Sequence, residues 1–274
     1  MLIPRKEIDE LSKNIRQIID GQAIDLRDNL EGRLSTLKND IHTLAGRLNQ
    51  RAQSLQAEKA AMANTLADIS HQIKTPLTAM TVMVELLETA PPEKHREFIS
   101  NLKQGLTQTE WLANALLKMA KLESGTATIT PTLFPASQLL GQALAPLSIL
   151  LDIKNQQIIQ TGEAQLYCDK NWTAEALTNI IKNASEHSPP GSTIEIKAGT
   201  NPISTWLSIT DAGPGIPATR IKDLFTRFNS SKRGTGIGLA LAQAIMRSQD
   251  GDLEVEGGGG GIGATFTMKF YLRE

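Results

Sequence analysis

The 274-residue chain has little of three things that often mark a protein's surroundings: cysteine, charge of one sign, and long apolar runs. Its one cysteine, Cys168, excludes an internal disulfide and is typical of a reducing compartment. Because it lies in the apolar run QLYC, we expect a buried small side chain rather than a nucleophile. The formal net charge of −1 gives no reason to expect nucleic acid as a partner.

No stretch approaches the ~18 uninterrupted apolar residues that a membrane span needs. The longest candidate, APLSILLDI, is too short, and the N-terminus lacks the charged-then-apolar pattern of a signal peptide. We therefore expect a soluble chain as it stands. Its length favours more than one structural unit.

Apolar residues recur at helical spacing in the first part of the chain. A helix is predicted over residues 5–20, with a stop at Gly21. After a short break the spacing alternates between three and four, which is the a/d seam of a coiled coil. The seam residues are Leu34, Leu37, Ile41, Leu44, Leu48 and Leu55. Residues 1–60 are thus predicted to form a helix and a coiled coil.

A second apolar stripe runs from Leu66 to Leu87 and stops at the sequence APPE. Another helical stretch follows from about Glu93 to Glu123, ending at Ser124-Gly125. Two striped helices joined by a proline-containing turn predict a helical hairpin over residues 61–125. Neither helix can bury its stripe alone, so we expect a homodimer that forms an antiparallel four-helix bundle.

The sequence changes character after Gly125. Short β-rich runs such as TIEIKAG and TWLSITD alternate with helical runs, and glycines gather between residues 213 and 263. Residues 126–274 are therefore predicted to form an α/β domain with glycine-rich loops, which makes the whole chain α+β.

The helix over residues 66–87 carries a histidine on its outer face. At about 100° per residue, His71 and Thr75 both lie roughly 160° from the centre of the apolar stripe. Such a histidine can be inert, but an exposed imidazole is largely neutral in cytosol and can act as a nucleophile. Gln72 and Lys74 flank it. Pro76, which removes a helix hydrogen bond, is expected to weaken or bend the helix.

Four signals for a nucleotide follow in order along the C-terminal half. NIIKNASEH places Asn179 and Asn183 on one helix face, where an asparagine loses its usual capping role. DAGPGI follows a predicted strand and places Asp211 at the strand end. RGTGIGLAL opens a helix, whose free N–H groups favour phosphate, and GIGATF leads into the last strand. A single glycine motif is weak evidence, but these four signals in this order indicate a nucleotide site.

These four segments resemble the N, G1, G2 and G3 boxes of the GHKL ATPase family, whose fold is the Bergerat α/β sandwich. DLFTRF, with Phe225 and Phe228, resembles the F box, and SHQIKTPL is similar to the phosphoacceptor box of the HisKA dimerisation domain. Over residues 60–274 the chain resembles a sensor histidine kinase of a two-component system. Residues 1–60 resemble a signalling coiled coil and, weakly, a HAMP domain.

The resemblance implies an ATP site with Mg²⁺ as cofactor. Asn183 would be the Mg²⁺ ligand with Asn179 nearby, and Asp211 would accept from the adenine amine. Thr265 would support the adenine side through its hydroxyl. Glu186 stands where many relatives carry a basic residue, which implies that a lid cation replaces that contact or that nucleotide affinity is lower.

The resemblance also implies a short mobile lid over residues 217–235. Its hinge glycines would be Gly213 and Gly215, and the glycines that approach the phosphates would be Gly236 and Gly238. The cations near the phosphates would be Arg227, Lys232 and Arg233.

The implied activity is autophosphorylation of His71 by ATP, followed by transfer to an aspartate of a response regulator. Gln72 replaces the acidic residue that assists the histidine in relatives, and Thr75 would position water for dephosphorylating the regulator, unless it is a plain surface threonine. The family's location implies the cytoplasmic part of a membrane-anchored sensor. Two alternatives stay open: a GHKL ATPase of the chaperone or mismatch-repair kind, and a catalytically inactive scaffold.

Overall fold

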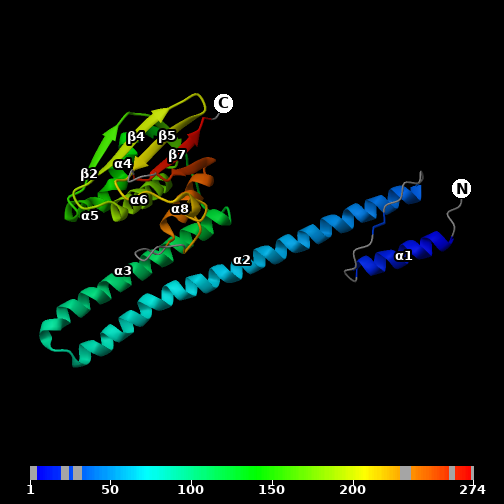
Figure 1. Ribbon diagram of the computed structural model, residues 1–274, viewed down its shortest axis with the longest axis horizontal. Coiled ribbons are helices and arrows are strands. Elements are labelled where there is room, and N and C mark those ends of the chain that lie inside the picture. The colour runs from blue at the N-terminus through cyan, green and yellow to red at the C-terminus, as the bar shows by residue number, and fades with distance from the viewer. Residues whose placement is uncertain (1–4, 20–24, 27–32, 229–235, 259–262, 273–274) are drawn as a thin grey trace. The chain divides into compact units, whose positions relative to one another are not determined.

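The computed structural model describes residues 5–19, 25–26, 33–228, 236–258 and 263–272, which form two compact units (Figure 1). The first unit is residues 1–68 and the second is residues 69–274.

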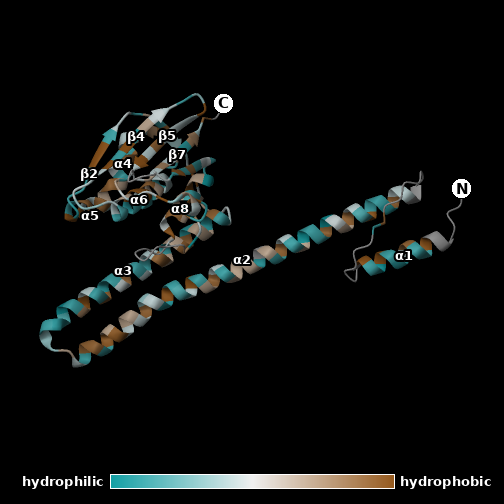
Figure 2. Cartoon of the chain, in the orientation of Figure 1, coloured by the Kyte–Doolittle hydropathy of each residue, from teal (hydrophilic) through white to brown (hydrophobic). Residues whose placement is uncertain are grey.

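The first unit contains helix α1 (Arg5–Ile19) and the beginning of the long helix α2 (Arg33–Thr89). Leu11 of α1 and Leu26 of the connector are buried, and the connector's Asp25 carboxylate lies 3.7 Å from the His42 imidazole on α2. The seam side chains on this part of α2 are exposed by about half or more, and apolar and polar residues alternate along the helix (Figure 2). They are Leu37, Leu44, Leu48 and Leu55. The coiled coil and the HAMP likeness stay predictions; the expected stop at Gly21 lies outside the described residues.

The second unit opens with the predicted helical hairpin, which is confirmed. Helix α3 (Pro92–Glu123) follows α2 after a two-residue turn, with a proline at its first position, where the missing N–H costs nothing. His95 Nε2 donates to the Ala90 carbonyl at 3.0 Å across the turn. Gly125, with φ +67°, ends the second arm as expected.

The two arms of the hairpin approach closely at Gly105. A Cβ placed on Gly105 would lie 2.8 Å from Met80 Cγ, so only glycine fits against the buried Met80 without displacement. The helix α2 continues through Pro76, which is itself buried in this face. The expected weakening of the helix at Pro76 stays a prediction, whereas a break in the helix does not occur.

A second apolar stripe of the hairpin is exposed instead of packed against another element of the described chain. Its side chains are exposed by 45% to 62%, too much for residues that contribute to a packed core. They are Leu77 and Val84 on α2 and Ile99, Leu106 and Leu117 on α3. The apolar face predicted for α2 is therefore divided: one side packs on α3 and the other has no partner within the described chain.

The predicted α/β domain is also confirmed (Figure 1). Its main sheet has the order β2-β4-β5-β7-β6, parallel between β2 and β4 and otherwise antiparallel. The strands are β2 (Gln157–Thr161), β4 (Thr193–Thr200), β5 (Ser204–Thr210), β6 (Gly251–Glu256) and β7 (Thr265–Tyr271). A two-stranded sheet joins β1 (Thr132–Pro135) to β3 (Gln165–Cys168). The helices are α4 (Ala136–Leu144), the 3₁₀ turn η1 (Ala145–Leu147), α5 (Ser148–Ile153), α6 (Lys170–His187), α7 (Ala218–Ile221) and α8 (Gly238–Arg247).

One face of the sheet packs against helices to form the core. Alternate residues of β4, β5 and β7 are fully buried, because side chains in a strand point to opposite faces in turn. Ile196, Ile209 and Phe266 contribute from the sheet, and Leu177 and Ile180 from α6. The other face is polar: for example, Lys269 Nζ donates to Glu254 Oε1 at 2.6 Å. This arrangement fixes the ends of β5 and β7 beside α6.

Among the described residues, one segment is long and apolar enough to span a membrane by length and composition: Ala136–Ile153. The sequence predicts no such segment, because its longest apolar run, APLSILLDI, is too short. In the structure it consists of α4, η1 and α5, and several of its side chains belong to the core of the α/β domain. A core helix passes the same test of length and composition.

Cys168 is fully buried, as expected, and burial raises the pKa of its thiol from 9.0 to about 11. Between these two pH values the unfolded thiol ionises while the folded thiol stays neutral, so stability is lost as the pH rises. We expect the free energy of unfolding to fall by about 2 kcal/mol more in wild type than in Cys168→Ala between pH 8 and pH 10.5. Urea unfolding at both pH values measures this; equal declines would contradict it.

Candidate nucleotide and phosphoacceptor site

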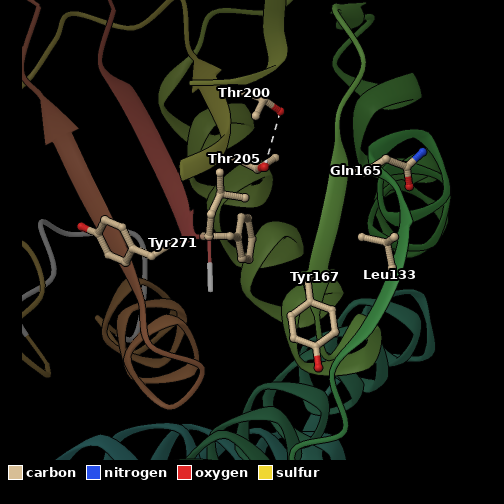
Figure 3. A pocket seen from close by; sticks show the side chains of 8 residues that line it. Leu133, Gln165, Tyr167, Thr200, Thr205 and Tyr271 are labelled. Atoms are coloured by element: carbon tan, nitrogen blue, oxygen red, sulfur yellow. Dashed lines mark hydrogen bonds between the residues drawn. The ribbon is translucent and has the colours of Figure 1, made fainter. Parts of the chain in front are cut away.

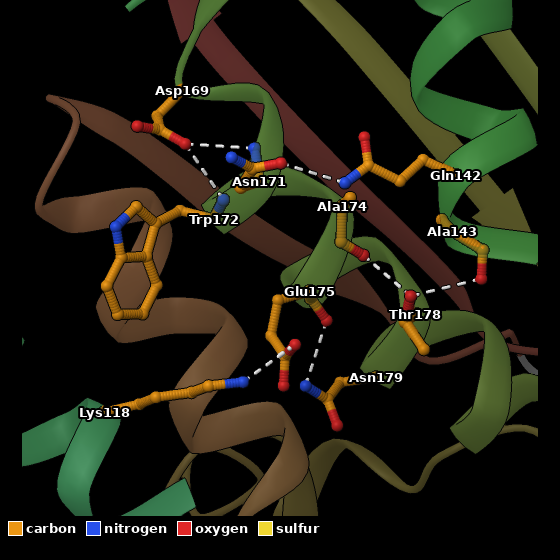
Figure 4. A network of polar contacts seen from close by, with 10 residues as sticks. All are labelled: Lys118, Gln142, Ala143, Asp169, Asn171, Trp172, Ala174, Glu175, Thr178 and Asn179. Atoms are coloured by element: carbon orange, nitrogen blue, oxygen red, sulfur yellow. Dashed lines mark hydrogen bonds and ion pairs between the residues drawn. The ribbon is translucent and has the colours of Figure 1, made fainter. Parts of the chain in front are cut away.

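Helix α6 carries both candidate asparagines. Figure 4 shows Asn179 and the start of the helix, where Asp169 anchors it. The Asp169 carboxylate caps it by accepting from the Asn171 and Trp172 N–H groups at 3.0 and 3.1 Å. One strongly capped end and a buried apolar face fix the rotation of the helix about its axis. The face with the asparagines is therefore set by packing, not by the asparagines themselves.

The two asparagines differ in their surroundings. Asn179 is buried, its Nδ2 donates to the Glu175 carbonyl at 3.0 Å, and its Oδ1 lies 3.1 Å from where a Cβ on Gly238 would be. Asn183, one turn later, is half-buried, and its amide makes no hydrogen bond to any described residue. Asn183 is thus the amide that is available to a ligand.

Asp211 follows strand β5 and is held by backbone donors. Its Oδ1 accepts from the N–H groups of Gly213 at 2.8 Å and Ala264 at 3.1 Å, and the residue is almost fully buried. No donor from the described part of the chain contacts Oδ2. A carboxylate with one oxygen fixed and the other open can accept a hydrogen bond from an exocyclic amine.

At two positions around Asp211 the backbone comes so close to neighbouring atoms that only glycine fits. A Cβ on Gly213 would lie 2.9 Å from both Asp211 Oδ1 and the His187 carbonyl oxygen. A Cβ on Gly263 would lie 1.8 Å from the Asp211 carbonyl oxygen, which no backbone tolerates. Gly213 was among the predicted site residues, whereas Gly263 was not singled out, although it lies within the GIGATF segment that indicated a nucleotide.

The structure does not bring Thr265 to this site. Its hydroxyl lies 2.9 Å from the Thr210 hydroxyl, across the β5–β7 pair on the polar face of the sheet. Ala264, the residue before it, faces the interior beside Asp211, because consecutive side chains of a strand point to opposite faces. The expected support of the adenine side by the Thr265 hydroxyl stays a prediction, and in this structure that hydroxyl lies on the face of the sheet away from Asp211.

The predicted lid is only partly described. Gly215 has φ +78° and Gly236 has φ +67°, conformations that favour glycine at the two ends of this segment. Gly238 begins helix α8. Lys232 and Arg233 lie outside the described residues. Arg227 forms an ion pair with Glu123 at the end of α3.

Glu186, which stands where the resemblance implies a basic residue, lies beside a lysine of its own helix. Its carboxylate lies 3.9 Å from Lys182 Nζ one turn earlier on α6, at the limit of an ion pair. Lys182 Nζ in turn lies 5.3 Å from the centre of the Trp111 ring of α3.

The phosphoacceptor candidate is accessible. His71 and Thr75 are both exposed on α2, and Thr75 Oγ1 donates to the His71 carbonyl at 3.1 Å. The His71 ring makes no hydrogen bond to the described residues, and Gln72 beside it is half-buried. The outward face predicted for His71 and Thr75 is confirmed.

Two cavities lie elsewhere. One of about 520 Å³ lies between the small sheet and the ends of β5 and β7, with Tyr167 and Tyr271 among its lining residues (Figure 3). The other, of about 460 Å³, lies between α3 and α8, with Arg227 and Arg247 at its wall. Neither Asn183 nor Asp211 lines either of these two cavities.

The residues present fit a magnesium nucleotide. Asp211 Oδ2 and the Asn183 amide are both available to a ligand, and glycines lie against Asp211 and Asn179 where any side chain would fill the space. No group of three or more His, Cys, Asp or Glu residues in the described ranges could hold a metal alone. Mg²⁺ would therefore depend on Asn183 and phosphate oxygens, which suits an ion bound through few protein ligands.

The structure combines a helical hairpin that exposes a histidine with a glycine-lined α/β fold suited to a nucleotide. This combination is typical of proteins that transfer phosphate from ATP to a histidine. Family models agree: residues 61–125 match the His Kinase A (phospho-acceptor) domain, and residues 168–274 match the histidine kinase-, DNA gyrase B-, and HSP90-like ATPases. The chain belongs to the sensor histidine kinases of two-component systems.

Similar curated proteins are also named as sensor proteins or sensor histidine kinases. The chain is 25% identical over 237 residues to the swarming motility regulation sensor protein RssA of Serratia marcescens, covering 81% of this chain and 50% of RssA. It is 27% identical over 204 residues to the probable sensor histidine kinase TcrY of Mycobacterium tuberculosis, covering 71% and 40%. The chain thus spans about half the length of the curated relatives it matches.

Solved structures share the fold. The histidine kinase AdeS of Acinetobacter baumannii superposes with a TM-score of 0.65 at 23% identity, covering 74% of this chain and 98% of that chain. The histidine kinase ThkA, solved in complex with the response regulator protein TrrA, superposes with a TM-score of 0.63 at 17% identity, covering 89% and 68%. The α+β fold class expected from the sequence is confirmed.

Proposed function

We propose that this chain is an ATP-dependent protein-histidine kinase that phosphorylates its own His71. A ring nitrogen of His71 attacks the γ-phosphorus, the bond to the β–γ bridging oxygen breaks, and ADP leaves with those electrons. The phosphoryl group then passes to a carboxylate oxygen of an aspartate on a response regulator. The observation that carries the proposal is an exposed histidine whose ring makes no hydrogen bond to the described residues, in the same chain as a nucleotide fold that leaves Asp211 Oδ2 open.

Each site residue has a defined part. Asp211 Oδ2 would accept a hydrogen bond from the adenine amine, and Asn183 would provide its amide oxygen to Mg²⁺. The ion, when bound, neutralises charge on the transferring phosphate. Asn179, already bonded to the Glu175 carbonyl, shapes the space opposite Gly238 instead of binding metal. Arg227 reaches phosphate only when its ion pair with Glu123 opens.

The open stripe on the hairpin supports a homodimer. Five large apolar side chains spread over both helices are exposed by 45% to 62%, and a second hairpin packed against them would bury this surface in a four-helix bundle. The response regulator is the second partner proposed. Three further points stay predictions. They are dephosphorylation of that regulator with help from Thr75, membrane anchoring, and the domain bounds 1–60, 61–125 and 126–274.

The proposal is tested by incubating the chain with γ-labelled ATP and Mg²⁺. We expect wild type to acquire a label that is stable in base and lost in acid, as a phosphoramidate is. His71→Ala should acquire none. ATP turnover without any protein label in either chain would instead indicate a plain GHKL ATPase, and the absence of both would indicate an inactive scaffold.

Gln72 should tune the rate at which His71 reacts. Its side-chain carbonyl can accept a hydrogen bond from the imidazole but cannot take up a proton, whereas a carboxylate can do both. We expect Gln72→Glu to speed autophosphorylation and Gln72→Ala to slow it, measured as initial rates of label incorporation at saturating ATP. One rate for all three chains would show that the residue has no such part.

A further inference from the structure

A buried glutamine holds the C-terminal end of α6. Gln156, just before strand β2, is 8% exposed. Its Nε2 lies 3.2 Å from the carbonyl oxygens of both Ser185 and Ser188 and 3.1 Å from that of Pro189, and its Oε1 accepts from Ser185 Oγ at 2.6 Å. The last carbonyls of a helix lack partners within the helix. Gln156 donates to the Ser185 carbonyl within the helix and to the Ser188 and Pro189 carbonyls at and just beyond its end. Lys154 Nζ, two residues earlier, also donates to the Ser185 and Glu186 carbonyls, so one segment of the chain supplies both sets of donors.

Ser188 connects this end of α6 to the loop after Asp211. The Ala212 N–H donates to Ser188 Oγ at 3.0 Å. The carbonyl of His187 lies 2.9 Å from the position of a Cβ on Gly213, so the chain at residues 187–188 packs directly on residues 212–213. Gln156 thus fixes the segment against which the loop beside Asp211 rests.

We propose that Gln156 is a positioning residue of the nucleotide site. Asn183 lies on α6 two residues before Ser185, the first residue that Gln156 holds, and Asp211 lies next to Ala212, whose N–H donates to Ser188. Gln156 therefore sets the relative placement of the metal ligand and the adenine acceptor without contacting nucleotide. This inference rests on the proposed function and adds a residue that the sequence motifs do not contain.

The first variant is Gln156→Glu in the full chain, compared with Gln157→Glu on the exposed neighbouring residue. A carboxylate has the same shape but no N–H to donate to three carbonyls. We expect the dissociation constant for ADP and the KM for ATP to rise about tenfold or more, with a smaller change in kcat, and Gln157→Glu to behave as wild type.

A second pair separates positioning from stability. Ser188→Ala removes the acceptor for Ala212 but leaves the carbonyl that Gln156 contacts. Ser185→Ala removes a buried hydrogen bond to Gln156 that has no connection to residue 212. We expect Ser188→Ala to weaken ADP binding about tenfold and Ser185→Ala to lower the unfolding temperature while keeping ADP affinity.

Calorimetric binding of ADP, run well below each variant's unfolding temperature, decides the matter. Wild-type affinity in both Gln156→Glu and Ser188→Ala would overturn the inference and leave Gln156 a plain helix cap. Failure of the wild-type chain itself to bind ADP would overturn the proposed function, and that result is distinguishable because it does not involve the variants.

Discussion

Gly263→Ala is expected to weaken nucleotide binding about 100-fold and to lower labelling of His71 accordingly. The added Cβ would lie 1.8 Å from the Asp211 carbonyl oxygen and 2.5 Å from its Oδ1. Both the backbone of β5 and the carboxylate that accepts from adenine would have to move, because neither contact is with the flexible end of a side chain. Such overpacking costs about 3 kcal/mol, which corresponds to about a 100-fold loss of affinity.

The matched control is Gly141→Ala in helix α4. A Cβ on Gly141 meets nothing within 4 Å, and alanine is favoured over glycine inside a helix by about 0.5–1 kcal/mol. This variant should bind ADP as wild type does and unfold at a slightly higher temperature. Unchanged ADP affinity in Gly263→Ala, measured on folded protein, would show that the loop can relax and that the close approach is not required.

The elements that sequence predicts well here are those whose pattern repeats. The hairpin follows from two long apolar stripes and the prolines between them, and the α/β domain from short alternating runs separated by glycines. The placement of Asn179, Asn183 and Asp211 follows once the helix and strand are assigned. Periodicity could not show that the stripe on α2 divides into a side packed on α3 and a side left open, because both sides have the same composition.

Sequence does not predict well which face of a strand a single residue occupies, or which residues far apart in the chain come into contact. The resemblance implies that Thr265 supports the adenine side, whereas its hydroxyl lies on the opposite face of the sheet from Asp211. The faces of a strand alternate, so a shift of one position moves a side chain from one face to the other. Gly263 is required only because another strand end crosses it, and its neighbours in sequence do not reveal this. Gln156 lies 29 residues from its partner Ser185, in a segment without any motif.

Asn183→Ala is expected to remove the magnesium-dependent part of the reaction. The Asn183 amide has no partner among the described residues, so its loss leaves no unsatisfied group and should not lower the unfolding temperature appreciably. Metal stabilisation of a transferring phosphate amounts to several kcal/mol, so autophosphorylation should fall by about 100-fold or more. Binding of adenosine at Asp211 should persist.

Two asparagines of the same helix serve as comparisons for Asn183. Asn171→Ala affects an exposed residue bonded only to Gln142 and its cap, and should retain full activity. Asn179→Ala leaves a space against Gly238 and breaks the bond to the Glu175 carbonyl, so it should lower stability as well as activity. Label incorporation and thermal unfolding on all three variants distinguish a metal ligand from a packing residue. Full activity of Asn183→Ala at limiting Mg²⁺ would reassign the metal to other groups.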